Sequence, residues 1–146
     1  MKKTIMAAFF IMVLTGCSAV NEVSNGLNYV PEATEYINEV QQFSKEVSAV
    51  AEKAVNDPRA REELENLLGD LKADISEFSD LTPPSLFEDI HNQVLEHNNQ
   101  LKDAVDQYST AIKEGKLSTD LLEQSGLLDD IAVYNDLLSQ IKKLGE

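Results

Sequence analysis

The sequence has a single cysteine and no tryptophan among its 146 residues. One cysteine cannot form an intramolecular disulfide, so the fold has to be stabilised by its core rather than by a disulfide framework. Basic residues are also scarce, because 12 Lys and Arg stand against 26 Asp and Glu, for a formal net charge of -14. Nucleic-acid-binding domains usually present a basic face, so this balance argues against a nucleic-acid partner.

Sequence motifs that carry catalysis or metal binding are missing as well. The chain has no HExxH, CxxC or EF-hand pattern, no phosphate-binding glycine loop and no GxSxG elbow. Its two histidines, His91 and His97, are six residues apart. That spacing is about 600° around a helix, so the two do not share the face that a helical metal pair requires. We therefore predict a non-enzymatic protein with no metal site and no cofactor.

The first seventeen residues, MKKTIMAAFFIMVLTGC, have the layout of a secretory signal peptide. Lys2 and Lys3 form a positive start, residues 5–14 form an uncharged apolar stretch, and small residues follow. A membrane-spanning helix needs about 20 apolar residues, and this stretch has roughly half that number. The pattern therefore predicts export rather than a transmembrane segment.

The end of this segment, Leu14-Thr15-Gly16-Cys17, resembles the lipobox of bacterial lipoproteins. The resemblance implies cleavage between Gly16 and Cys17 and a diacylglyceryl group on the Cys17 thiol. We accordingly expect a signal peptide at 1–16, a lipidated N-terminus and short tether at 17–28, and a folded domain at 29–146. Two acyl chains give stable attachment to a membrane. We expect the outer face of a Gram-positive cell membrane, with the outer membrane of a Gram-negative envelope as the alternative.

Residues 29–146 show the apolar periodicity of helices and no strict alternation typical of half-buried strands. The spacing predicts long helices over 31–55, 58–78 and 85–115, and shorter helical pieces up to 145. Pro31 and Pro58 are expected at first helical positions, and Pro83-Pro84 break the chain. The predicted fold is all-α: an antiparallel bundle of three long helices plus a short C-terminal helical segment.

Two polar residues interrupt the apolar stripe of the third predicted helix. His97 comes three residues after Val94 and four before Leu101, and Asn98 follows it. A buried polar side chain normally finds a hydrogen-bond partner, so one interpretation is a satisfied histidine at the edge of the core. The other interpretation is a polar hole in which His97 and Asn98 contact a ligand or a partner side chain.

Four segments, LNYVPEATEYINEV, AVNDPRAREELENL, HNNQL and IKKLGE, together resemble a family of small helical lipoproteins of unknown function from bacillus-type Gram-positive bacteria. The resemblance implies the fold and the location and no catalytic residue. We expect a membrane-anchored extracytoplasmic lipoprotein that binds a partner in the envelope without catalysis. The alternative is a lipoprotein that binds a small molecule or a cation.

Overall fold

The computed structural model describes the backbone of residues 17–146 and the side chains of residues 28–146, and its regular elements are all helical. They are α1 (Cys17–Ala54), α2 (Pro58–Ser79), the 3₁₀ turn η1 (Ser85–Phe87), α3 (Glu88–Lys113), α4 (Leu121–Gln124), α5 (Leu127–Ala132) and α6 (Tyr134–Gly145). The predicted all-α class is confirmed. The signal peptide predicted at 1–16, including Gly16, lies outside the described residues.

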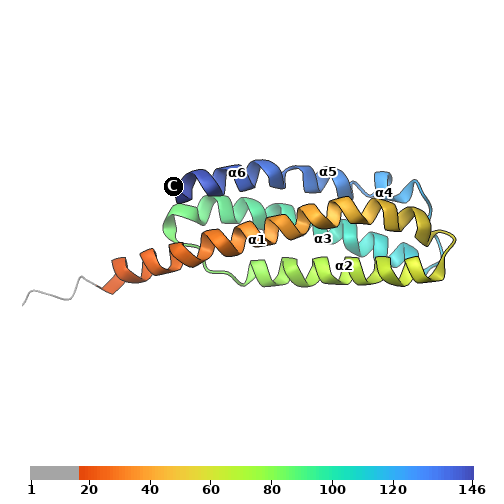
Figure 1. Ribbon diagram of the computed structural model, residues 1–146, viewed down its shortest axis with the longest axis horizontal. Coiled ribbons are helices and arrows are strands. Elements are labelled where there is room, and N and C mark those ends of the chain that lie inside the picture. The colour runs from red at the N-terminus through yellow and green to blue at the C-terminus, as the bar shows by residue number, and fades with distance from the viewer. Residues whose placement is uncertain (1–16) are drawn as a thin grey trace, which may run out of the picture.

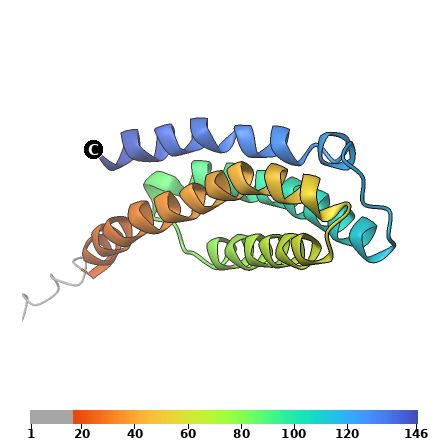
Figure 2. The ribbon, with the colours of Figure 1, turned by 45° about the vertical axis from the view of Figure 1, so that its right-hand side comes forward.

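The three long helices lie side by side, and the C-terminal helices cover α1 and α3 (Figure 1). The colour gradient runs in opposite directions along α1 and α2, and again along α3 and α6. Helix α1 packs against α2 and α6, while α3 packs against α2, α5 and α6. Figure 2 shows α5 and α6 as a separate layer on the side of the bundle away from α2.

The first helix begins at Cys17 and continues through Pro31, so the predicted start at Pro31 was wrong. A proline inside a helix removes one backbone N–H and crowds the preceding turn, but its fixed φ suits helical geometry. Pro31 is exposed, so water can hydrate the carbonyl that loses its partner. The segment 17–28, predicted as a short tether, is therefore the leading part of α1.

The connection between α1 and α2 follows the predicted pattern. Asp57 caps α2 by accepting a hydrogen bond from the Arg59 backbone N–H at 2.9 Å, and Pro58 occupies the first turn. The Arg61 side chain reaches back and donates to the Ala54 and Val55 carbonyls, at 3.3 and 3.4 Å. Arg61 thus satisfies carbonyls that the end of α1 leaves without helical partners.

Two glycines set the breaks before the C-terminal helices. Gly115 ends α3 with φ of +69° and Gly126 precedes α5 with φ of +71°. This left-handed region is unfavourable for residues that carry a Cβ atom. The chain can therefore leave α3, turn through α4 and return along the bundle as α5 and α6.

The core runs the length of the bundle and receives side chains from every helix whose side chains are described. Its largest fully buried members include the aromatic side chains of Tyr29, Phe78, Tyr108 and Tyr134. Burying a Leu, Val or Phe side chain contributes about 1.5–3 kcal/mol to folding. Within the described chain, no helix combines the length and the apolar character that a membrane crossing requires.

Candidate functional site

A polar centre lies where α1, α3 and α6 meet. Asn98 in α3 is 2% exposed, and its side-chain oxygen Oδ1 accepts hydrogen bonds from two tyrosine hydroxyls. Tyr36 donates from α1 and Tyr134 donates from α6, each at 2.5 Å. The Asn98 amide nitrogen is buried and has no hydrogen-bond partner among the described residues. Asn98 therefore connects three helices while both N–H donors of its amide group remain without a partner among the described residues.

Both tyrosine hydroxyls remain protonated over the ordinary pH range. Burial raises the pKa of Tyr36 well above its usual value, and the neighbouring Tyr134 raises it further. Burial likewise raises the pKa of Tyr134. Protonated hydroxyls can donate to an amide oxygen, so the pKa shifts agree with the direction of the two hydrogen bonds.

His97, predicted to share a site with Asn98, lies at the edge of this centre. It is half-buried, and its ring is 6.4 Å from that of Tyr134 in an edge-on arrangement. Its Nδ1 atom is buried without a hydrogen-bond partner among the described residues. Burial raises the pKa of Asp130 in α5, and the nearby His97 opposes part of that rise. His97 and Asn98 therefore lie together but have different surroundings.

The more deeply buried histidine is His91, to which the sequence assigned no role beyond excluding a metal pair with His97. His91 is 4% exposed, and its Nδ1 atom lies 3.1 Å from the Tyr29 hydroxyl. Its ring stacks on Phe78 at 4.9 Å, and burial lowers its pKa. Its position four residues after Phe87 and three before Val94 was a helical core signal that could have identified it.

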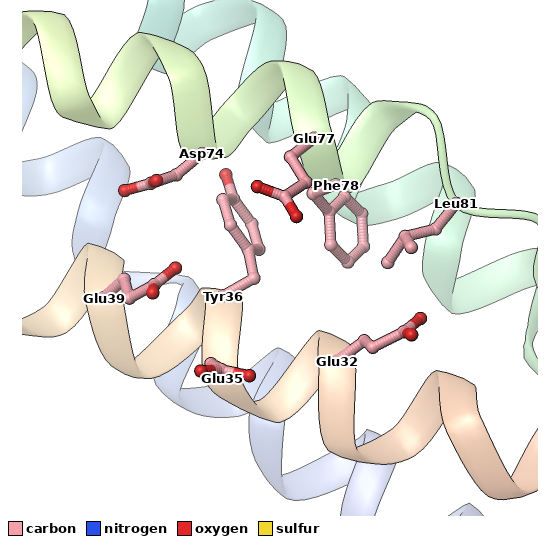
Figure 3. Close-up of a pocket in the computed structure, with 8 residues that line it drawn as sticks. All are labelled: Glu32, Glu35, Tyr36, Glu39, Asp74, Glu77, Phe78 and Leu81. Atoms are coloured by element: carbon pink, nitrogen blue, oxygen red, sulfur yellow. The ribbon is translucent and has the colours of Figure 1, made fainter.

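An acidic groove of about 340 Å³ lies between α1 and α2 (Figure 3). Its walls carry five carboxylates and its floor carries aromatic and aliphatic side chains. The residues that line it are Glu32, Glu35, Tyr36, Glu39, Asp74, Glu77, Phe78 and Leu81. Tyr36 and Phe78 stack with their ring centroids 4.6 Å apart. Because the Tyr36 hydroxyl also binds Asn98, the groove and the polar centre share one side chain.

The carboxylates of the acidic groove repel one another. Burial raises the pKa of Glu39, and the charges of Asp74, Glu35 and Glu77 raise it further. Burial also raises the pKa of Asp74, together with the charges of Asp70 and Glu77. No basic residue lines the groove. A positively charged group placed there would relieve this repulsion.

The carboxylates of the groove come from two helices, α1 and α2. Among residues 28–146, no three His, Cys, Asp or Glu side chains come close enough together to hold a metal ion. The Tyr36 and Phe78 rings at the floor stack on each other and are almost fully buried, so the carboxylates are the part of the groove that a ligand can reach. Such a groove suits an organic cation with several positive charges, because those charges would relieve the repulsion among the carboxylates.

Comparisons with known proteins agree with the family resemblance of the sequence. A family of unknown function, DUF6376, matches residues 29–144. A relative from Bacillus subtilis (strain 168), described as "Uncharacterized lipoprotein YybP", is 38% identical over 143 residues. The match covers 98% of this chain and 97% of the relative. No solved structure matches the chain.

Proposed function

The chain belongs to the DUF6376 family of unknown function, and we propose that it is an exported lipoprotein held on the outer face of a Gram-positive cell membrane. A diacylglyceryl group on Cys17 is the anchor, and the helical bundle binds a partner in the cell envelope without catalysis. The observation that carries the anchor is Leu14-Thr15-Gly16-Cys17 directly after the apolar segment. The lipoprotein description of the Bacillus subtilis relative supports it.

The position of Cys17 supports this role in a second way. Cys17 is the first residue of α1, and the same helix supplies Tyr36 to the polar centre. A lipid on Cys17 would thus attach to a helix that is continuous with the core. The two acyl chains would keep the bundle close to the membrane, because each buried CH₂ contributes about 0.8 kcal/mol.

The anchor is tested by metabolic labelling with an alkyne fatty acid. The wild-type protein should be labelled and should partition into detergent and membrane fractions. Cys17→Ala should lose the label and remain uncut after Gly16, whereas the control Ser18→Ala should retain both properties. Equal labelling of wild type and Cys17→Ala would refute the anchor. A pull-down of the anchored protein from its native membrane then identifies envelope partners.

A second candidate function is binding of a small organic cation in the acidic groove. The observation that favours it is that five carboxylates and no basic residue line one concave surface. The raised pKa values of Glu39 and Asp74 favour a ligand that brings positive charge.

Spermidine provides a defined probe for this second function. Isothermal titration of the lipidated protein in detergent should detect spermidine binding. The triple variant Glu35→Gln/Glu39→Gln/Asp74→Asn should weaken that binding at least about tenfold, which corresponds to about 1.4 kcal/mol. The matched control is Glu62→Gln/Glu63→Gln/Glu65→Gln, which removes the same charge from α2 outside the groove. Equal weakening by both triple variants would mean that spermidine responds to net charge and not to the groove.

A further inference from the structure

One end of the bundle carries exposed apolar side chains. Among residues 28–146, the large apolar side chains that are well exposed are Leu86, at 62%, and Leu144, at 40%. Leu86 lies in η1, Leu144 lies in the last turn of α6, and η1 packs against α6. The half-buried Val30 lies at the same place, because a Cβ atom on Gly145 would be 3.2 Å from a Val30 methyl group. We call Val30, Leu86 and Leu144 the apolar end.

The apolar end is also the end from which α1 leads to Cys17. In both ribbon views, the C-terminus and the start of α3 lie at the side of the molecule where α1 leaves the bundle (Figures 1 and 2). The turn between α1 and α2 and the connection from α3 to α4 lie at the opposite end. The two exposed leucines therefore come from distant parts of the sequence and meet on the side of the anchor.

We propose that the apolar end rests on the outer leaflet of the membrane to which Cys17 attaches the protein. The proposal rests on the lipid anchor of the proposed function. Attachment through Cys17 keeps the exposed leucines near the lipid surface, so their contact with lipid becomes an intramolecular event. A contact too weak to bind a free domain to a membrane can therefore hold an anchored one in a defined orientation.

The length of α1 determines how the bundle must lie. A helix rises 1.5 Å per residue, so the part of α1 from Cys17 to Asn28 spans roughly 17 Å. A bundle standing upright on this part of α1 would hold Leu86 and Leu144 away from the lipid. The bundle therefore leans, with the apolar end lowered onto the surface and the α1–α2 turn away from it.

Charge contributes little to this contact. Lys142 and Lys143 are exposed in the last turn of α6 and make no ion pair with the described residues. Anionic headgroups attract such lysines, but Glu88 and Asp89 at the start of α3 and the terminal Glu146 offset them. The leucines thus provide the contact, and we expect it to persist at high salt.

Single-cysteine fluorescence tests this orientation, because the anchor occupies the only native cysteine. The lipidated protein is labelled with nitrobenzoxadiazole at Leu86→Cys, Leu144→Cys or, as the control at the opposite end, Asn56→Cys. Each variant is placed in vesicles of equimolar phosphatidylglycerol and phosphatidylethanolamine. Probes at 86 and 144 should emit at shorter wavelength and resist iodide quenching in low and high salt. The probe at 56 should remain fully quenchable.

The dye is itself apolar and can enter lipid without help from the leucines. A second experiment therefore places the dye beside the leucines and changes the leucines themselves. A probe at Lys143→Cys should be protected in the native background and lose most of that protection when Leu86→Asp and Leu144→Asp are added. The matched control adds Asn56→Asp and Ser118→Asp, two exposed positions at the opposite end, and should retain the protection. Equal protection of the Lys143→Cys probe in both charged backgrounds would overturn the proposal.

Three further outcomes would also overturn it. Equal quenching at positions 86, 144 and 56 in protein that floats with the vesicles would show that the anchor exists but the end does not dock. Protection that persists in detergent and rises with protein concentration would show that a second copy covers the leucines. Failure of the wild-type protein to float with vesicles would refute the lipid anchor of the proposed function, and the docking with it.

Discussion

Tyr134 in α6 donates its hydroxyl to Asn98 Oδ1 in α3 over 2.5 Å, and this bond ties the C-terminal helix to the centre of the bundle. Tyr36 in α1 donates to the same oxygen. The amide of one residue therefore specifies how three helices meet. It also couples the core to the acidic groove, since Tyr36 lines that groove.

The first prediction concerns this polar centre. Asn98→Leu should destabilise the protein by about 2–3 kcal/mol, because it leaves two buried hydroxyl groups without their acceptor. The triple variant Tyr36→Phe/Asn98→Leu/Tyr134→Phe should recover most of that loss, since replacing all partners by apolar groups can be nearly neutral. Urea unfolding measures both. A triple variant less stable than Asn98→Leu would contradict the prediction, and the exposed Asn99→Ala is the control.

The second prediction contrasts the two histidines. His97→Leu should change the free energy of unfolding by at most about 1.5 kcal/mol, because His97 Nδ1 has no hydrogen bond to lose among the described residues. His91→Leu should cost more, about 1–3 kcal/mol, because it leaves the buried Tyr29 hydroxyl without its partner. Thermal unfolding of both variants provides the comparison. A larger loss for His97→Leu than for His91→Leu would reverse our assignment of the structural histidine.

The third prediction is a pH dependence that originates at His91. Burial lowers its pKa in the folded protein, so the folded state disfavours the charged imidazole relative to the unfolded chain. The resulting stability is present above the unfolded pKa of about 6.5 and is lost as the pH falls toward the lowered folded value. Urea midpoints at successive pH values below neutrality should therefore decline less steeply in His91→Gln than in wild type. Parallel declines would show that other groups carry the acid sensitivity.

The fourth prediction concerns the acidic groove, where a fall in pH should stabilise the folded protein instead of destabilising it. Burial, and after it the neighbouring carboxylates, raise the pKa of Glu39. Its negative charge therefore destabilises the folded state above that pKa, and this loss of stability disappears as the pH falls below the ordinary glutamate value. Glu39→Gln should therefore raise the melting temperature at pH 7, and the gain should vanish in acid. Glu62→Gln, outside the groove, is the control. A melting temperature that is unchanged or lower in Glu39→Gln at pH 7 would contradict mutual repulsion in the groove.

The fifth prediction compares two glycines. Gly69 lies in α2 without a positive φ, and a Cβ atom added there would meet nothing within 4 Å beyond its own helix backbone. Gly69→Ala should therefore stabilise the helix by about 0.5–1 kcal/mol. Gly126→Ala should instead destabilise by about 1–2 kcal/mol, because residue 126 has φ of +71°. Chemical denaturation distinguishes the signs. Equal effects of the two substitutions would mean that backbone conformation does not decide the outcome.

Local pattern was enough to predict the helices themselves. The apolar spacing, the Asp57-Pro58 start of α2 and the end of α3 at Gly115 depend on residues within one or two helical turns, so they are readable from the chain. The start of α1 could not be predicted in this way, because Pro31 is compatible both with a first turn and with an exposed position inside a helix. A single proline cannot distinguish these two cases without the flanking backbone.

The polar centre depended on tertiary structure for a geometric reason. Positions 97 and 98 both lie at spacings of three and four from Val94 and Leu101, so either side chain suits the apolar stripe. Tyrosine hydroxyls from α1 and α6 meet position 98, and they place Asn98 rather than His97 at the centre.

By itself, the sequence determined the all-α class, the family resemblance and the likeness of residues 14–17 to a lipobox, because each depends on residues close together in the chain. The tertiary structure decided which polar residue occupies the core and that carboxylates from α1 and α2 face one another across a groove. It also brought Leu86 and Leu144 to the end from which α1 departs. These relationships join residues from separate helices. Periodicity specifies which face of a helix is apolar but not which neighbouring helix that face meets, and only the packed bundle settles that choice.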